Sequence, residues 1–313
     1  MAAFLVARLA SLLATLAATS ILVFLALDAL PGDSAQTLLG PDAAPEAVAA
    51  LARKLGLGLP LHQRYLDWLG GMARGDFGAS SAYDTPAAGL ILERLAVSLP
   101  LALLAMALAV LLALAMGIFA AARHRSAADA AVMALSQAGM ALPSFWLGIL
   151  LALLFAVHLR WLPAGGFPGW AAGAWPALRA LILPALALAL VQAAILARVA
   201  RASMLEAMGQ DYVRTARAKG LSRGEALRRH VLRNALGPIL AVAGLQFANL
   251  VASSVVVENV FALPGLGRLV FQSIGNRDTA VVRDCVLLLA AFVVAVNFAV
   301  DVLAAIADPR LRA

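Results

Sequence analysis

The sequence predicts an all-α, polytopic membrane protein with six transmembrane helices and both termini in the cytoplasm. Of its 313 residues, 63% are hydrophobic and only 13% are charged, and the mean hydropathy is +0.92. Soluble proteins carry about 25% charged residues, so this chain has too little charge to cover a water-exposed surface of its size. Long uncharged runs predict the membrane spans, and the distribution of Lys and Arg predicts their orientation in the membrane.

Each of the six runs is long enough to cross a bilayer as a helix, because about 20 apolar residues span the hydrocarbon core. A helix also satisfies its backbone hydrogen bonds within the run. An alternative for the first run is a cleaved signal peptide, but its basic leader is only Arg8 and its apolar stretch exceeds the usual length. The runs are residues 9–27, 95–122, 131–157, 180–197, 236–257 and 286–306.

Basic residues gather on one side of the predicted membrane. With the N-terminus inside, the inner segments hold 14 of the 24 Lys and Arg residues, nine of them between Arg198 and Arg233, and the two short outer loops hold five. Cytoplasmic loops are enriched in Lys and Arg, so both termini are predicted to be cytoplasmic. The formal charge of +7 therefore reflects membrane topology, and we expect no nucleic-acid partner.

Three parts follow from this topology. They are a first transmembrane helix at 1–30, an extracytoplasmic helical segment at 31–94, and a five-helix core at 95–313 that contains a cytoplasmic loop at 198–235. The outer segment, of about 65 residues, is too small for an independent enzyme domain. Either a docking surface or a plain helical lid fits its composition.

Two helices are predicted in the outer segment. The first has Pro45 at its first position and Gly56 just beyond its end. The second lies in LHQRYLDWLGGMARGDFG and is ended by glycines. Four apolar side chains share one face of this second helix: Leu61, Tyr65, Trp68 and Leu69.

The stretch DYVRTARAKG in the cytoplasmic loop predicts a short helix. Asp211 is placed to cap a helix over 212–219, and Gly220 sits where a left-handed residue usually ends one. The helix has a basic side and an apolar side, formed by Arg214 and Arg217 and by Val213 and Ala216.

A second cytoplasmic helix follows at once. Ser222 and Glu225 match a capping box for a helix over 223–235, which continues into the fifth span. A DNA-binding helix-turn-helix is disfavoured, because a helix continuous with a membrane span is not free to enter a groove. A basic loop that merely faces lipid headgroups is the remaining alternative.

Two spans carry polar stripes at helical spacing, and Pro143 is expected to loosen the third span locally. The stripes either line a route through the membrane or pack against neighbouring helices. Asn297 and Asp301 share a face of the last span, with an open choice between a pathway and interhelical packing. The stripe residues are Gln137, Met140 and Ser144, and Gln246, Asn249 and Ser253.

The outer loop ENVFALPGLGRL follows the fifth span. Pro264 and Gly265 predict a type II turn, because proline presets the first turn dihedral and glycine tolerates the second. We expect this turn to fold the loop over the outer mouth. The residues of interest are Glu258, Phe261, Pro264, Gly265 and Gly267.

The chain lacks signatures of catalysis. It has no phosphate-binding loop of the G-x-x-x-x-G-K-[ST] type, one cysteine, and four histidines scattered along the sequence. We expect no catalytic residue, no metal site and no cofactor. An ion-driven carrier working alone would need charged residues near the bilayer midplane or an inverted repeat, and neither is evident.

Several motifs occur together in one order. They are LGLGLPLHQRYLDWLGGMARGDFG, LPSFWLG, WLPAGG, DYVRTARAKGLS with RHVLRNALGP, VVVENVFALPGLGRL, NFAVD and DPRLR. Over nearly the whole chain they resemble ABC-importer permeases of the dipeptide, oligopeptide and nickel family. The broader superfamily has an EAA-xxx-G signature and a later I-x-L-P. Ala216 and Gly220 match that signature, whereas Arg214 and Thr215 replace its Glu-Ala and no I-x-L-P follows.

The resemblance implies a type I ABC-importer permease of a bacterial inner membrane. It implies a second homologous permease subunit, two ATPase subunits and an extracytoplasmic substrate-binding protein as partners. Short peptides are the leading solute, with nickel, glutathione or another small solute as alternatives. It also implies that the first cytoplasmic helix couples to the ATPase through Asp211, Tyr212, Arg214, Thr215, Ala216, Arg217, Lys219, Gly220 and Ser222.

Overall fold

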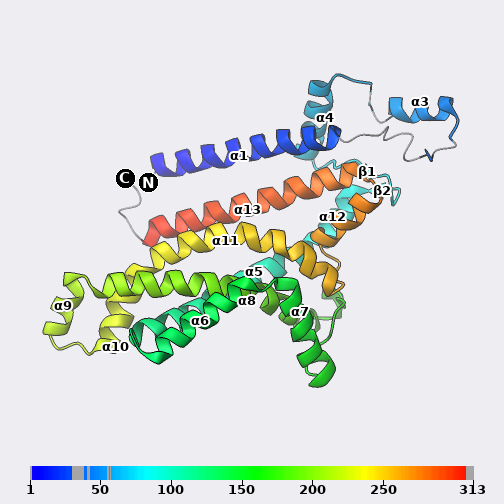
Figure 1. Cartoon of the computed structure of the whole chain (residues 1–313). Helices are drawn as coiled ribbons and strands as arrows, with labels where there is room; N and C mark the ends of the chain where they lie inside the picture. The colour runs from blue at the N-terminus through cyan, green and yellow to red at the C-terminus, as the bar shows by residue number, and fades with distance from the viewer. Residues whose placement is uncertain (1, 30–38, 41–42, 55, 57, 308–313) are drawn as a thin grey trace.

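The computed structural model describes residues 2–29, 39–40, 43–54, 56 and 58–307, and it is almost wholly helical (Figure 1). Met1 and the segment 308–313, with the DPRLR motif, lie outside the described residues. Five described helices are long and apolar enough to cross a membrane. They are α1 (Ala2–Asp28), α5 (Ala87–Ala122), α8 (Ala174–Met208), α11 (Leu232–Val260) and α13 (Thr279–Ala307).

Shorter elements lie at the two ends of this bundle. The start of α1 and the end of α13 lie at the same end as α9 and α10, and α4, α12 and the strands lie at the other (Figure 1). This agrees with the predicted topology. The shorter elements are α3 (Pro45–Lys54), α4 (Leu61–Ala73), β1 (Ala79–Ser80), β2 (Thr85–Pro86), α6 (Ala127–Ala141), α7 (Ser144–Ala152), η1 (Leu153–His158), η2 (Trp170–Ala172), α9 (Asp211–Ala218), α10 (Arg223–Ala226), η3 (Leu227–Val231) and α12 (Leu266–Gly275).

The third predicted span is not one straight helix. Its two halves, α6 and the α7–η1 segment, meet at an angle of 102°. Leu142 is extended, with ψ 130, because the ring of Pro143 disfavours helical geometry in the preceding residue. Pro143 also lacks the N–H needed to continue the hydrogen-bond ladder. The sequence predicted only a local loosening at Pro143, and the observed break of 102° is far larger. Counted as one bent span, this pair is the sixth candidate.

Helix α8 lies at the centre of the bundle. It packs against α5, α6, α7 and α11, and 72% of its most apolar stretch is buried, against 11% for α1 and for α13. Small residues allow close contact. A Cβ on Gly117 of α5 would lie 2.6 Å from the Cβ of Ala200, so only glycine permits this approach. The helices α1 and α13 therefore form the periphery, and α8 forms the core.

The outer segment is anchored to the bundle through α4. Trp68 donates a hydrogen bond to Asp284 of α13 at 2.7 Å, and Tyr65 pairs with Ser20 of α1 at 2.7 Å. Both rings also contact Phe24. Helix α3 begins at Pro45 as predicted. On the predicted apolar face of α4, Tyr65, Trp68 and Leu69 are half-buried, whereas Leu61 at its start is 49% exposed.

Candidate functional site

Helix α9 is an amphipathic helix fixed on the cytoplasmic end of the bundle. Val213 and Ala216 are buried, and Val213 belongs to an apolar cluster with Met204 of α8 and Leu227 and Val231 of η3. The opposite side is exposed and mostly polar. The predicted coupling residues on it are Asp211, Tyr212, Arg214, Thr215, Arg217, Lys219, Gly220 and Ser222, whereas Ala216 faces the bundle.

The start of α9 differs from the prediction. Asp211 is the first helical residue, and Gln210 occupies the cap position without a capping hydrogen bond from its side chain. The Asp211 carboxylate instead lies 3.4 Å from Arg214 Nη1. An acid in the first turn still favours the helix, because it interacts with the positive end of the helix dipole.

The corner after α9 has the predicted geometry. Gly220 has φ +95, a left-handed conformation that favours glycine. The Leu221 amide donates to the Ala216 carbonyl at 3.3 Å, closing the helix end. The capping box is also confirmed, since the Glu225 amide donates to Ser222 Oγ at 3.3 Å and the Ser222 amide donates to Glu225 Oε2 at 2.9 Å.

Tyr212 braces this corner against the fifth span. Asn234 Nδ2 donates to the Tyr212 hydroxyl at 2.9 Å and to the His230 carbonyl at 2.9 Å. The chain from α10 through η3 to α11 is continuous, as predicted, with a π-helical turn at η3. Helix α9 is therefore held on both sides, by α8 before it and by η3–α11 after it.

At the outer end, Glu258 is fully buried where α5, α11 and α12 meet. Ser98 Oγ of α5 donates to Glu258 Oε1 at 2.5 Å, and the Arg268 amide donates to Oε2 at 3.1 Å. Ser98 Oγ also accepts from the Leu266 amide at 2.8 Å. The carboxylate thus fixes the first turn of α12, where free amides and the helix dipole favour an anion.

The turn before α12 is not type II. Gly265 has φ −105, and the positive φ lies at Ala262 instead, with φ 50. Both glycines leave room for the buried carboxyl group of Glu258. A Cβ on Gly265 would lie 2.3 Å from Glu258 Cδ, and one on Gly267 would lie 2.9 Å from Glu258 Oε2 and 2.5 Å from Val255 Cα. The prediction assumed a conformational role for Gly265, and its role here is close packing.

Phe261 and Pro264 belong to the same outer region. Phe261 is buried in the main core, and its carbonyl accepts from the Gly166 amide at 2.8 Å. A Cβ on Gly165 would lie 2.6 Å from that carbonyl oxygen. The WLPAGG loop therefore packs directly on the end of α11. Pro264 lies between Leu263 and Gly265, whose backbone groups form a tight turn at 2.9 Å.

The two polar stripes make separate contacts. In α11, Asn249 Nδ2 donates to Gln246 Oε1 at 3.0 Å, Asn249 is exposed and Ser253 is half-buried. In α6, Gln137 and Met140 both contact Arg198 of α8. Ser144 lies beyond the 102° bend, so it does not continue the face of Gln137 and Met140.

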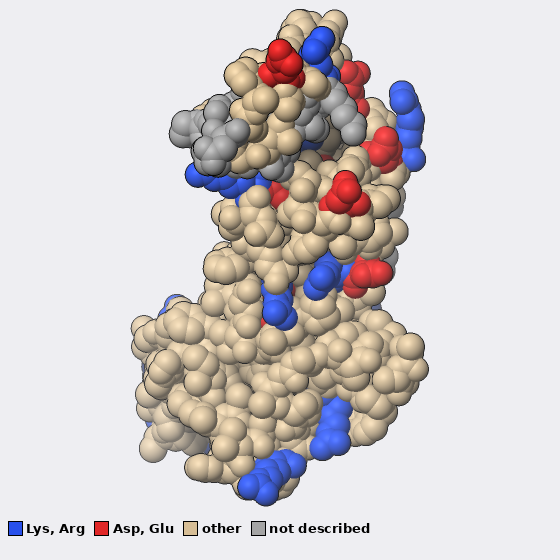
Figure 2. Space-filling view, turned by 90° about the vertical axis from the view of Figure 1, so that its right-hand side faces the viewer, with Lys and Arg blue, Asp and Glu red and all other residues tan. Residues whose placement is uncertain are grey.

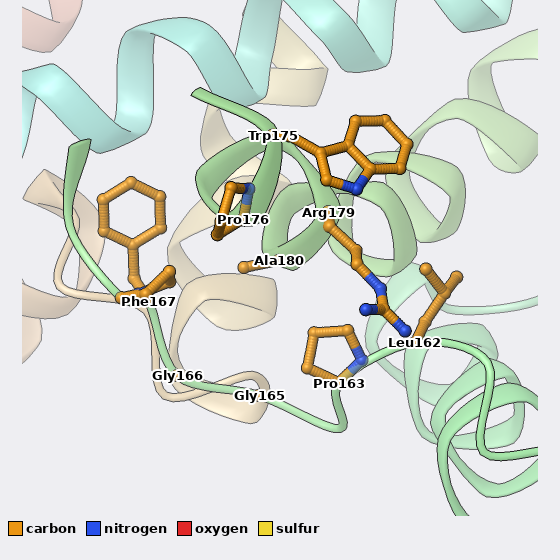
Figure 3. Close-up of a pocket in the computed structure, with 10 residues that line it drawn as sticks. Leu162, Pro163, Gly165, Gly166, Phe167, Trp175, Pro176, Arg179 and Ala180 are labelled. Atoms are coloured by element: carbon orange, nitrogen blue, oxygen red, sulfur yellow. The ribbon is translucent and has the colours of Figure 1, made fainter. Parts of the chain in front are cut away.

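The loop between η1 and α8, together with the first turns of α8, lines an open pocket of about 680 Å³ (Figure 3). The Arg179 guanidinium donates to the Trp161 carbonyl beside it. Figure 2, which views the outer end, shows acidic side chains from its top down to about mid-height and a broad lower surface with few charges. The WLPAGG motif gave no indication of a pocket in the sequence. The pocket is lined by Leu162, Pro163, Gly165, Gly166, Phe167, Pro168, Trp175, Pro176, Arg179 and Ala180.

An ion pair between α6 and α8 was also not predicted. Arg201 of α8 donates to both oxygens of Asp129 at 2.6 and 2.7 Å, and Asp129 is 4% exposed. The Arg125 amide adds a third hydrogen bond to that carboxylate at 3.0 Å. The pair ties the α5–α6 turn to α8. An acid three residues after the N-cap Ser126 was the only signal in the sequence.

Comparisons with known proteins agree with this architecture. Residues 113–313 match the family described as binding-protein-dependent transport system inner membrane component, and residues 1–115 match the N-terminal model of the same kind of protein. A putative peptide transport system permease protein of Brucella abortus is 44% identical over 312 residues, covering 100% of this chain and 99% of that protein.

A glutathione transport system permease protein of Escherichia coli is 38% identical, covering 99% of this chain and 98% of that protein. Among solved structures, the MetNI methionine ABC transporter aligns with a TM-score of 0.54 at 19% identity, covering 70% of this chain and 96% of that chain. That likeness supports the fold. The chain belongs to the family of inner-membrane permease subunits of binding-protein-dependent ABC transport systems.

Proposed function

We propose that this chain forms half of the translocation path of an ATP-driven importer for short peptides. Its partners are a second homologous permease, two ATPase subunits and an extracytoplasmic binding protein. The observation that carries the proposal is α9, whose buried side is packed on the bundle while its basic side remains exposed. Relatives named as peptide and glutathione permeases support the solute class, with nickel or another small solute as the alternative.

We assign a different role to each of the three parts of the chain. Helix α1 (within 1–30) and the outer segment 31–94 form the periphery and the cap, and 95–313 forms the core with the coupling loop 198–235. Closure of the ATPase pair would push α9, and α8 would carry that displacement into the bundle because only Gly209 and Gln210 separate them. ATP hydrolysis belongs to the partner subunits, and this chain changes no covalent bond.

Uptake into vesicles tests the proposal. The purified permease pair, reconstituted with its ATPases and its binding protein, is expected to import a labelled tripeptide only when ATP and the binding protein are both present. Omission of the ATPases should abolish uptake. Uptake driven by a proton or sodium gradient without ATPases would contradict the importer and favour a carrier that works alone.

We also propose that the cap receives the binding protein. Helix α4 is tied to α1 and α13 through Tyr65 and Trp68, whereas α3 is amphipathic and lies beyond it (Figure 1). A deletion of 45–75 would remove those anchors together with the docking surface. A deletion confined to 45–54 removes α3 and keeps them.

Deleting 45–54 is expected to reduce ATP hydrolysis stimulated by the binding protein while basal hydrolysis stays unchanged. The measurement is the ATPase rate of the reconstituted complex with and without saturating binding protein. Trp68→Ala is the comparison variant, because it leaves a buried Asp284 oxygen without its donor and should lower stability as well. Equal loss of basal and stimulated rates in the α3 deletion would argue against docking.

A further inference from the structure

The guanidinium of Arg198 has only uncharged partners. Its Nη1 donates to Gln137 Oε1 at 3.1 Å and lies 3.4 Å from the sulfur of Met140. In the described part of the chain, no carboxylate oxygen lies within 4.0 Å of it. A guanidinium carries five N–H donors, so most of its hydrogen-bonding capacity is left over.

The neighbouring arginine shows what a structural role looks like here. Arg201, one turn further along α8, is neutralised by Asp129 in a bidentate pair. The carboxylate of Asp129 is therefore already engaged by Arg201. Of these two arginines on adjacent turns of α8, Arg201 is paired with a carboxylate and Arg198 is not.

Arg198 is one of the few exposed residues in the inner part of the central helix. Between residues 181 and 208 of α8, the exposed positions are Leu190, Arg198, Ala202 and Glu206, while the rest of this stretch is wholly or partly covered, and α8 packs against α5, α6, α7 and α11. Among the candidate spans, α1 and α13 are the least buried, at 11% each. A charged side chain in a spanning helix usually faces the bundle interior or a water-filled cavity. The sequence placed Arg198 at the start of the cytoplasmic loop, but in the structure α8 continues beyond it for ten residues, about 15 Å of helix, to Met208.

We propose that Arg198 is an anion-binding contact in the inner half of the translocation path, which takes the carboxylate of a passing solute. This inference rests on the proposed import function and names the chemical class that the path favours. A guanidinium matches a carboxylate with two parallel hydrogen bonds. Gln137 orients the guanidinium and adds an amide donor beside it. For a short peptide, the group bound is the C-terminal carboxylate.

The hydrogen bonds that Arg198 makes to its present partners are weak, which suits a site that must bind a solute and then release it. Hydrogen bonds to neutral acceptors add little net free energy, so an arriving carboxylate displaces Gln137 and Met140 at low cost. A permanent acid such as Asp129 would instead hold the guanidinium and block exchange. Selective conduction needs sites that bind well enough to admit a solute and weakly enough to let it leave.

The test compares two forms of one peptide in the complete importer. Trialanine with a free carboxylate and trialanine amide are supplied at saturating, separately measured occupancy of the binding protein, and uptake is expressed per ATP hydrolysed. Arg198→Gln is expected to lower uptake of the free acid about tenfold, the usual scale for one charge-assisted bond, and to leave the amide within about twofold. Arg198→Lys should keep most of the free-acid uptake.

Arg123→Gln is the matched control. Arg123 is also exposed near the cytoplasmic face, and among the described residues its guanidinium lies over the uncharged Phe119 ring and forms no ion pair, so its loss should change neither peptide. Equal loss of both peptides in Arg198→Gln, or no loss, would overturn the proposal. A loss that follows the phosphatidylglycerol content of the vesicles would assign the guanidinium to lipid phosphate and overturn it too. Failure of the wild type to import either peptide would instead refute the peptide importer.

Discussion

Replacing Gly267 with alanine should lower the apparent melting temperature of the purified complex by roughly 5 °C, because the new methyl group has no space. Its Cβ would lie 2.5 Å from Val255 Cα and 2.9 Å from Glu258 Oε2. The first of these is a backbone atom, so α11 and α12 must separate to relieve the contact. Separation would also break the bonds from Ser98 and the Arg268 amide to the buried carboxylate. Thermal unfolding of the reconstituted protein measures the shift.

Gly275→Ala provides the matched control for this prediction. Gly275 ends the same helix, α12, and a Cβ there meets nothing within 4 Å. Its melting temperature should stay within about 2 °C of the wild type, since exposed substitutions usually change stability by less than about 0.5 kcal/mol. Glu258→Ala should reproduce the loss of Gly267→Ala, because buried donors without an acceptor each cost about 1–3 kcal/mol. A wild-type melting temperature in Gly267→Ala would show that the contact between α11 and α12 does not support the outer end.

The spans could be predicted from composition because the bilayer imposes a simple rule of length and hydropathy. That rule says nothing of straightness. The run 131–157 satisfies it, yet Pro143 bends the chain by 102°, because proline restricts the preceding residue as well as its own amide. Periodicity across residues 137–144 therefore combined two helices that point in different directions. Helix ends were also missed, as in α8, which extends to Met208 beyond its apolar run.

Local geometry in the coupling loop was predictable because it depends on neighbours in sequence. The hydrogen bonds that close the corner at Gly220 and those of the Ser222–Glu225 capping box join residues no more than five apart in sequence. The site around Glu258 could not be predicted from the sequence, because its hydrogen-bond partner Ser98 is 160 residues away and only the fold brings the two together. Pro264 and Gly265 matched a turn pattern, but Gly265 is extended and lies against the buried Glu258 carboxyl group. Tertiary packing overrides a local turn preference in such cases.

Replacing Gly220 with valine should uncouple ATP hydrolysis from transport while the permease still inserts and assembles. Gly220 has φ +95, and a Cβ there would meet nothing within 4 Å, so the cost is backbone strain without any clash. A β-branched residue in this conformation costs about 1–2 kcal/mol. That strain is small beside the packing of the bundle, but it acts on the corner that sets the direction of α9 relative to α10. Relaxation would reorient the exposed face that we assign to the ATPase.

Gly224→Val isolates the effect of the corner. Gly224 lies four residues away in α10, a Cβ there also meets nothing within 4 Å, and its backbone φ is not in the left-handed region. Both variants are purified with their partners, and ATPase retention, ATP hydrolysis and solute uptake are measured together. A strain of about 1–2 kcal/mol corresponds to about 5- to 30-fold weaker ATPase docking, so Gly220→Val should lose uptake per ATP and Gly224→Val should not. Wild-type uptake by Gly220→Val would refute the mechanical role of this corner and leave the basic loop as a determinant of topology.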